Sequence, residues 1–136
     1  MRFRMARINI DQFAILTDIV PNGSLEVNVT LSLKYSMDVR RIATSMSFVF
    51  GEESERILML ELTCEFEIHE EDWLAAIDGS KLVIPKVMLE HFAVQTVGTA
   101  RGILHCKTEG SQFNGIILPP VNVTELVTED MILPIE

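Results

Sequence analysis

The chain of 136 residues has the length of one domain, and its 48% hydrophobic and 23% charged residues exclude a largely disordered polypeptide. Its 11 Lys and Arg residues against 20 Asp and Glu residues give a formal net charge of −9. This balance argues against binding to nucleic acid or to an anionic membrane surface. The mean hydropathy of +0.27 is high for so acidic a chain. We therefore expect either a large core or apolar surface that another molecule covers.

No run of apolar residues approaches the roughly 18 that a membrane-spanning helix requires. Polar residues interrupt the segment after the basic N-terminus, so neither a signal peptide nor membrane insertion is predicted. Cys64 and Cys106 are the only cysteines, too few for a disulfide framework. We expect a cytoplasmic protein with two buried free thiols.

The first expected element is a short strand over residues 5–11. An apolar connection follows from Phe13 and ends in a turn at Pro21-Asn22-Gly23. This connection is unusually hydrophobic for a loop.

Strict alternation of apolar and other residues predicts three further strands, each with one buried face, over residues 25–35, 41–50 and 56–68. The segment Gly51-Glu52-Glu53-Ser54 predicts a hairpin loop between the last two. On residues 56–68 the second face carries three glutamates, and a solvated sheet face is sufficient to explain them; they are Glu61, Glu65 and Glu67.

After the strands, the spacing of the apolar residues changes from a period of two to helical spacing. A short helix is expected over residues 70–78, ended by Gly79, and a long helix is expected after Pro85 through about Lys107. Gly98 and Gly102 lie inside the long helix, where each costs about 1 kcal/mol relative to Ala, so we expect a packed neighbour close to its backbone.

The C-terminal part begins with an extended apolar stretch over residues 113–120. Asn122 is expected to cap a brief helix through Val127, and the apolar tail from Met131 shows no clear periodicity. Strands first and helices after predict an α+β fold over residues 1–136, one domain with an antiparallel sheet and helices on one face.

The sequence contains few candidates for catalytic residues. The cluster His69-Glu70-Glu71-Asp72 could bind a metal ion, although a solvated acidic turn explains it better. His91 and His105 are too far apart on one helix to share an ion, and His105 and Cys106 point in different directions. With no nucleotide, nucleophile or zinc motif, we expect a non-enzymatic binding or assembly domain without metal or cofactor.

An enzyme or small-ligand carrier that uses His91, His105 or Cys106 is the alternative from another class. It predicts a closed polar pocket beside those side chains.

Apolar residues on the second faces of the strands, namely Val49, Ile57 and Met59, predict more apolar surface than one sheet and two helices can bury. With the apolar connection and tail, they predict a homo-oligomer. The alternative is that the terminal apolar stretches fold back on the sheet.

The sequence resembles the SecB family of protein-export chaperones. The likeness runs in order along nearly the whole chain, and these segments carry it: Arg7-Ile8, residues 25–35, Phe50-Gly51-Glu52-Glu53-Ser54, Ile84-Pro85, Arg101-Gly102 and Ile117-Leu118-Pro119-Pro120-Val121-Asn122-Val123-Thr124-Glu125-Leu126.

The resemblance implies a four-stranded antiparallel sheet with a long helix and a short C-terminal helix, assembled as a homotetramer that is a dimer of dimers. It also implies an ATP-independent holdase that binds unfolded preproteins for the SecA translocase. A dedicated chaperone of one partner, such as an antitoxin, is the alternative among binding proteins.

In the family, two loops form the apolar groove for clients. Carried over, these positions are Phe13, Ile15, Leu16, Ile19 and Val20 with Phe113, Ile116, Ile117 and Leu118. Where the family has a translocase-contacting glutamate, this chain has Met59, so the acidic surface expected to face SecA is Glu61, Glu65 and Glu67.

Overall fold

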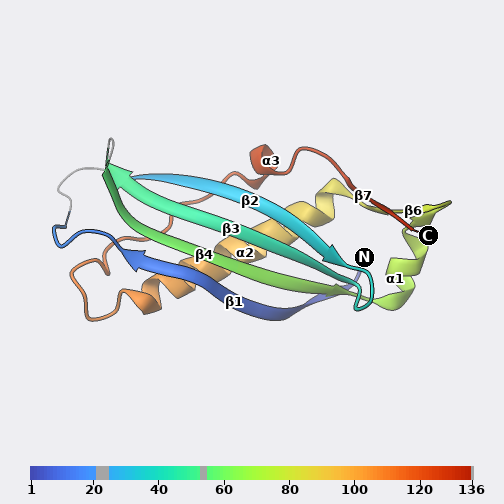
Figure 1. The fold of residues 1–136 in the computed structure, drawn as a ribbon, viewed down its shortest axis with the longest axis horizontal. Coiled ribbons are helices and arrows are strands. Elements are labelled where there is room, and N and C mark those ends of the chain that lie inside the picture. Colours follow the sequence, from blue (N-terminus) through green and yellow to red (C-terminus); the bar gives the residue numbers. More distant parts are fainter. Residues whose placement is uncertain (21–24, 53–54, 136) are drawn as a thin grey trace.

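The computed structural model describes residues 1–20, 25–52 and 55–135. Four long antiparallel strands form one sheet in the order β1-β4-β3-β2 (Figure 1). They are β1 (Phe3–Ile15), β2 (Glu26–Ser36), β3 (Arg41–Glu52) and β4 (Glu55–Ile68). The helix α2 (Lys86–Lys107) runs along one face of this sheet. The predicted α+β fold is therefore confirmed.

The three alternating runs became strands because each buries one face. Even-numbered side chains of β3 and β4 are buried against α2, among them Phe48, Leu60 and Phe66. The Phe66 and Phe92 rings stack with centroids 4.6 Å apart, and Phe3 meets Phe92 edge-on at 4.9 Å. These aromatic contacts join β1, β4 and α2 at the end of the sheet where β1 begins and β4 ends.

Strand β1 is longer than the predicted residues 5–11 and takes in Phe13 and Ile15, which the sequence suggested lie in a connection. Its pairing with β4 shifts register between Met5 and Arg7 and again between Ile10 and Gln12. Each β-bulge adds one residue and interrupts the period of two from which strands are predicted.

A second sheet was not predicted. The helix α1 (Glu70–Ala75) is shorter than expected and is followed by β5 (Ile77–Asp78) and β6 (Lys81–Ile84). β7 (Met131–Pro134) pairs with β6, so this sheet has the order β5-β6-β7. The apolar tail thus folds back on its own chain. The alternative considered above had it fold back on the main sheet, whereas it pairs with β6.

The C-terminal helix α3 (Val123–Leu126) is confirmed with its cap, because the Asn122 side chain accepts a 3.2 Å hydrogen bond from the Thr124 N–H. Four expectations about single residues were wrong. Ile57 is 3% exposed and belongs to the core, whereas Cys106 is exposed rather than buried. Gly98 and Gly102 have open space where a Cβ would stand, so no neighbour within the described chain requires glycine there.

Gly51 is required by its surroundings. A Cβ on it would stand 2.5 Å from the carbonyl oxygen of Glu55, at the register shift where β3 meets β4. Glu53 and Ser54 of the predicted hairpin loop lie outside the described residues.

We expect Gly51→Ala to lower the free energy of unfolding by about 1–3 kcal/mol, because the new methyl group overlaps backbone. Gly98→Ala is the matched control and should raise it by up to about 1 kcal/mol, because the site is helical and open. Urea unfolding followed by circular dichroism measures both. Equal effects of the two substitutions would contradict the prediction.

Candidate functional site

Two loops meet at the left end of the molecule in Figure 1, the segment after β1 and the segment after α2. The Gln112 side-chain Nε2 donates a 2.7 Å hydrogen bond to the carbonyl oxygen of Asp18. The structure therefore places the two predicted walls of a client groove, which are far apart in the sequence, at one end of the sheet.

The nine residues predicted for this groove differ in exposure. Phe113 and Leu118 are 4% and 2% exposed and belong to the core, while Phe13 and Ile116 are half-buried. The other five are exposed, and we refer to them as the loop patch: Ile15 (37%), Leu16 (47%), Ile19 (75%), Val20 (39%) and Ile117 (65%). The buried members therefore anchor the loops, and the exposed members offer apolar area.

Hydrogen bonds hold the loop after α2 in place. The Asn114 side chain donates to the His105 carbonyl oxygen at 3.0 Å and to Thr108 Oγ1 at 3.1 Å. Further along, Arg101 Nε donates at 2.9 Å to the carbonyl oxygen of Leu118. Because polar bonds hold the backbone and Phe113 and Leu118 anchor it, Ile117 can remain exposed at no cost to the packing around it.

The loop after β1 is anchored at its start. The Leu16 N–H donates at 2.8 Å to the Ile57 carbonyl oxygen on β4, and the Ile19 N–H donates at 3.3 Å to Thr17 Oγ1. Beyond Leu16 the chain leaves the sheet, which explains why Ile19 has the highest exposed fraction in the patch.

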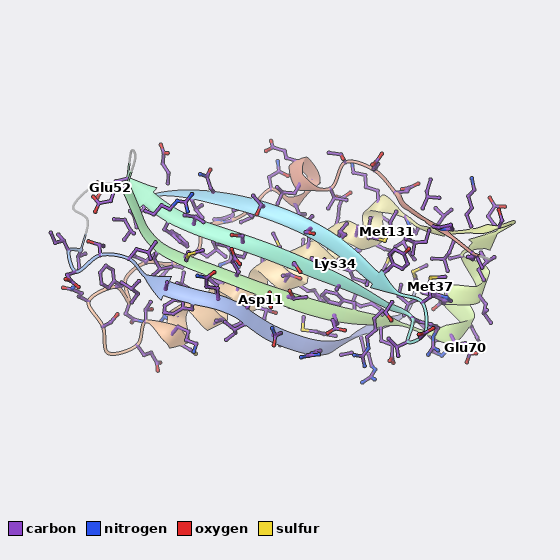
Figure 2. All side chains as sticks on the ribbon, viewed as in Figure 1. Asp11, Lys34, Met37, Glu52, Glu70 and Met131 are labelled. Carbon is purple, nitrogen blue, oxygen red and sulfur yellow. The ribbon has the colours of Figure 1, made fainter. Side chains whose placement is uncertain are left out.

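The predicted acidic surface lies on the sheet face opposite α2, the face that carries Lys34 in Figure 2. It is not purely acidic. Arg4 Nε lies 3.0 Å from Glu67, and Arg7 and Arg41 approach Glu65 at 3.7 and 3.5 Å. Glu61 accepts a weak 3.4 Å hydrogen bond from Ser47. Sequence reasoning missed these arginines because they come from two other strands.

In the part of the chain that the structure describes, the side chains considered for catalysis face solvent rather than a closed pocket. His91, His105 and Cys106 are all exposed on α2. An open hollow of about 420 Å³ lies beside Cys106, and it is lined by Ile10, Gly98, Thr99, Gly102, Ile103, Cys106 and Lys107. Within the described ranges, no three His, Cys, Asp or Glu residues are grouped as metal ligands.

Arg2 engages the acidic turn that could have suggested a metal site. Its guanidinium donates hydrogen bonds to Asp72 at 3.0 Å and to Glu71 at 3.2 Å.

Of the helices that the structure describes, none combines the length and the apolar character needed to cross a membrane.

A solved structure matches the fold described above over most of both chains. The chain superimposes with a TM-score of 0.51 and 13% identity on the Mycobacterium tuberculosis Rv1957 SecB-like chaperone, solved in complex with a ChAD peptide from the Rv1956 HigA1 antitoxin. The match covers 88% of this chain and 91% of that one. The fold is SecB-like.

At this identity the likeness shows the fold alone. No protein-family model and no curated protein sequence matches the chain. The comparison therefore supports a SecB-like fold for this chain. The matched neighbour is a chaperone rather than an enzyme.

The arginine contacts predict how stability changes in acid. The Arg4 guanidinium lowers the pKa of Glu67 below its ordinary value, and the backbone N–H and side chain of Arg2 do the same for the pKa of Asp72. Since the folded pKa lies below the unfolded one, each contribution is complete above the unfolded pKa and is lost as pH falls through the folded value.

We therefore expect the free energy of unfolding to fall as pH decreases from about 5 to about 3. Glu67→Gln should reduce this slope, because it removes one linked carboxylate. Glu109→Gln, in an exposed turn after α2, should leave it unchanged. Urea unfolding across this pH range measures the slope, and equal slopes for wild type and Glu67→Gln would contradict the assignment.

Proposed function

We propose that this protein is an ATP-independent holdase that binds extended segments of unfolded polypeptides at the loop patch. The observation that carries the proposal is the patch itself: five exposed aliphatic side chains, one at the end of β1 and four in two loops that a hydrogen bond joins, at one end of a SecB-like fold. An open apolar surface of this kind accepts many sequences, because aliphatic contacts impose no fixed shape on the client.

Charge supports the same proposal. The net charge of −9 keeps a complex with an apolar client in solution and disfavours acidic clients. Three glutamates lie at the strand ends nearest the loop patch: Glu26, Glu52 and Glu55. Figure 2 labels Glu52 at this end of the sheet. Basic or uncharged segments are therefore the favoured clients.

We extend the proposal to the assembly of the protein and to its part in export. We propose a cytoplasmic homotetramer, a dimer of dimers built from one domain spanning residues 1–136, that delivers preproteins to SecA. Docking on SecA would use the sheet face opposite α2. Glu61 is the principal candidate there, because arginines already compensate Glu65 and Glu67.

A dedicated chaperone of one partner is the second candidate, because the matched chaperone was solved with a peptide from an antitoxin. Binding of many unrelated unfolded proteins distinguishes a holdase from a dedicated chaperone.

We expect Ile19→Ser combined with Ile117→Ser to weaken binding of an extended peptide by at least about tenfold. Each exposed side chain would lose roughly 1 kcal/mol or more of apolar burial in the complex. Fluorescence anisotropy with a labelled unfolded peptide measures the affinity. Light scattering measures how far the variant delays aggregation of a reduced client at a stoichiometric ratio.

The matched control is Val87→Ser combined with Ile132→Ser, both 59% exposed and away from the loop patch. Both double variants should unfold at wild-type urea concentrations, because they change only exposed side chains. Equal binding by both would remove the loop patch from the proposal. No protection of any client by the wild type would refute the holdase function.

A second experiment separates the two chaperone candidates. The tagged protein is mixed with several chemically unfolded proteins of unrelated sequence, and the affinity for each is measured by anisotropy. A general holdase gives affinities within about tenfold of one another, because the contacts are nonspecific. Binding to none of them, with tight binding to one protein encoded beside its gene, would favour the dedicated chaperone.

A further inference from the structure

The sheet face opposite α2 is basic toward the end where β1 begins and β2 ends. Cations from three strands lie there, and we refer to them as the basic cluster: Arg4, Arg7, Lys34 and Arg41. Figure 2 labels Lys34 on this face. In a chain with a net charge of −9, the cluster is a local reversal of sign.

The glutamates of this region lie beneath the arginines. The side chains of Arg4 and Arg7 are 67% and 62% exposed, whereas those of Glu67 and Glu65 are 25% and 24% exposed. The guanidinium groups therefore form the outer layer of the surface. A molecule that approaches this end of the sheet face meets positive charge first.

The basic cluster has more hydrogen-bond donors than its two glutamates can satisfy. Arg4 Nε lies 3.0 Å from a Glu67 oxygen, but Arg7 and Arg41 stay 3.5 Å or more from the carboxylates. Within the described residues, Arg41 Nε is buried and has no hydrogen-bond partner. Because each guanidinium carries five N–H donors, the cluster can bind a further acceptor without breaking the contacts it already makes.

A β-bulge sets the spacing of the two exposed arginines. Arg4 and Arg7 are three positions apart in the sequence, so a regular strand would turn them to opposite faces. The register shift between Met5 and Arg7 brings both to one face, opposite Glu67 and Glu65, which are two positions apart on β4. Two positions of a strand span about 7 Å. An extended segment with an acidic residue at every second position presents its carboxylates with the same repeat.

A recess continues the basic cluster beyond Arg4. It is an open hollow of about 280 Å³, lined by Arg2, Phe3, Arg4, Glu67 and His69. Arg2 is already bonded to Asp72 and Glu71, so Arg4 supplies the charge of this hollow. The hollow gives the end of a bound segment room for one more side chain.

We propose that the basic cluster binds an extended acidic segment of a partner polypeptide, with alternate carboxylates on Arg4 and Arg7. Charge complementarity selects the occupant, and guanidinium–carboxylate hydrogen bonds are among the strong ones. A short segment stays within about 10 Å of the cluster, where salt does not screen the attraction, whereas a long polyanion also meets the acidic remainder of the molecule. Because the loop patch lies at the opposite end of the sheet, this binding is independent of any client.

Peptide binding to the wild-type protein tests the proposal without any substitution. The probe is a labelled peptide in which glutamate alternates with serine, and its control has glutamine in place of glutamate. Anisotropy should show at least about tenfold tighter binding of the glutamate peptide, with most of the difference lost between about 0.05 M and about 0.5 M salt. Equal affinity for the two peptides would overturn the proposal. Binding of single-stranded DNA of equal charge as tightly as the glutamate peptide would also overturn it.

Paired substitutions locate the site. We expect Arg4→Gln with Arg7→Gln to weaken binding of the glutamate peptide by at least about tenfold. The matched control is Arg56→Gln with Lys107→Gln, which removes two exposed cations at the other end of the molecule and changes the net charge equally. It should bind as the wild type does. Equal losses in the two variants would mean that net charge alone acts, and would refute the site.

Two further measurements separate this site from other effects. Urea unfolding of both variants shows whether they fold, and the wild-type comparison decides the question where one does not. The variant Ile19→Ser with Ile117→Ser should bind the glutamate peptide with wild-type affinity, because it alters only the loop patch. Loss of binding in this variant would place the acidic segment on the loop patch and overturn the assignment to the basic cluster.

Discussion

The packing of α2 against the inner faces of β3 and β4 is the constraint on which the other features depend. The Phe66 and Phe92 rings stack between the sheet and the helix, and Phe3 meets Phe92 from β1. This packing buries one face of β3 and β4, and the opposite face, which carries Glu61, Glu65 and Glu67, is left without a covering helix among the described residues. The loops leave from the ends of the sheet. The loop patch is therefore exposed where the core ends and not in a cleft within it.

The bulges of β1 follow from the same constraint. Without the extra residue at each register shift, Ile8 and Ile10 could not lie on the same face as Phe3 and Phe13. A strand of continuous alternation would turn Ile8 and Ile10 toward the polar face. The bulges keep the apolar side chains facing α2 even where the helix does not cover them, which leaves Ile8 and Ile10 exposed at the edge.

Local periodicity predicted the parts of the fold in which a period is uninterrupted: β2, β3, β4 and α2. It failed where the period is broken or short. The bulges divided β1, so its end was interpreted as a connection from Phe13 onward. The second sheet was missed because β6 and β7 have four residues each and lie far apart in the sequence. Pairing over such a distance leaves no local pattern to recognise.

The candidate site shows a different limit. The resemblance identified the loops, but only three-dimensional packing separates the anchoring Phe113 and Leu118 from the exposed Ile19 and Ile117. All four are large apolar residues in apolar stretches, so composition cannot tell them apart. The high mean hydropathy therefore has three sources of different kinds: a full core, the exposed loop patch, and the exposed Ile8 and Ile10 on the edge strand β1. Only the core is covered within one chain, and a net charge of −9 opposes association through the apolar surface that stays exposed.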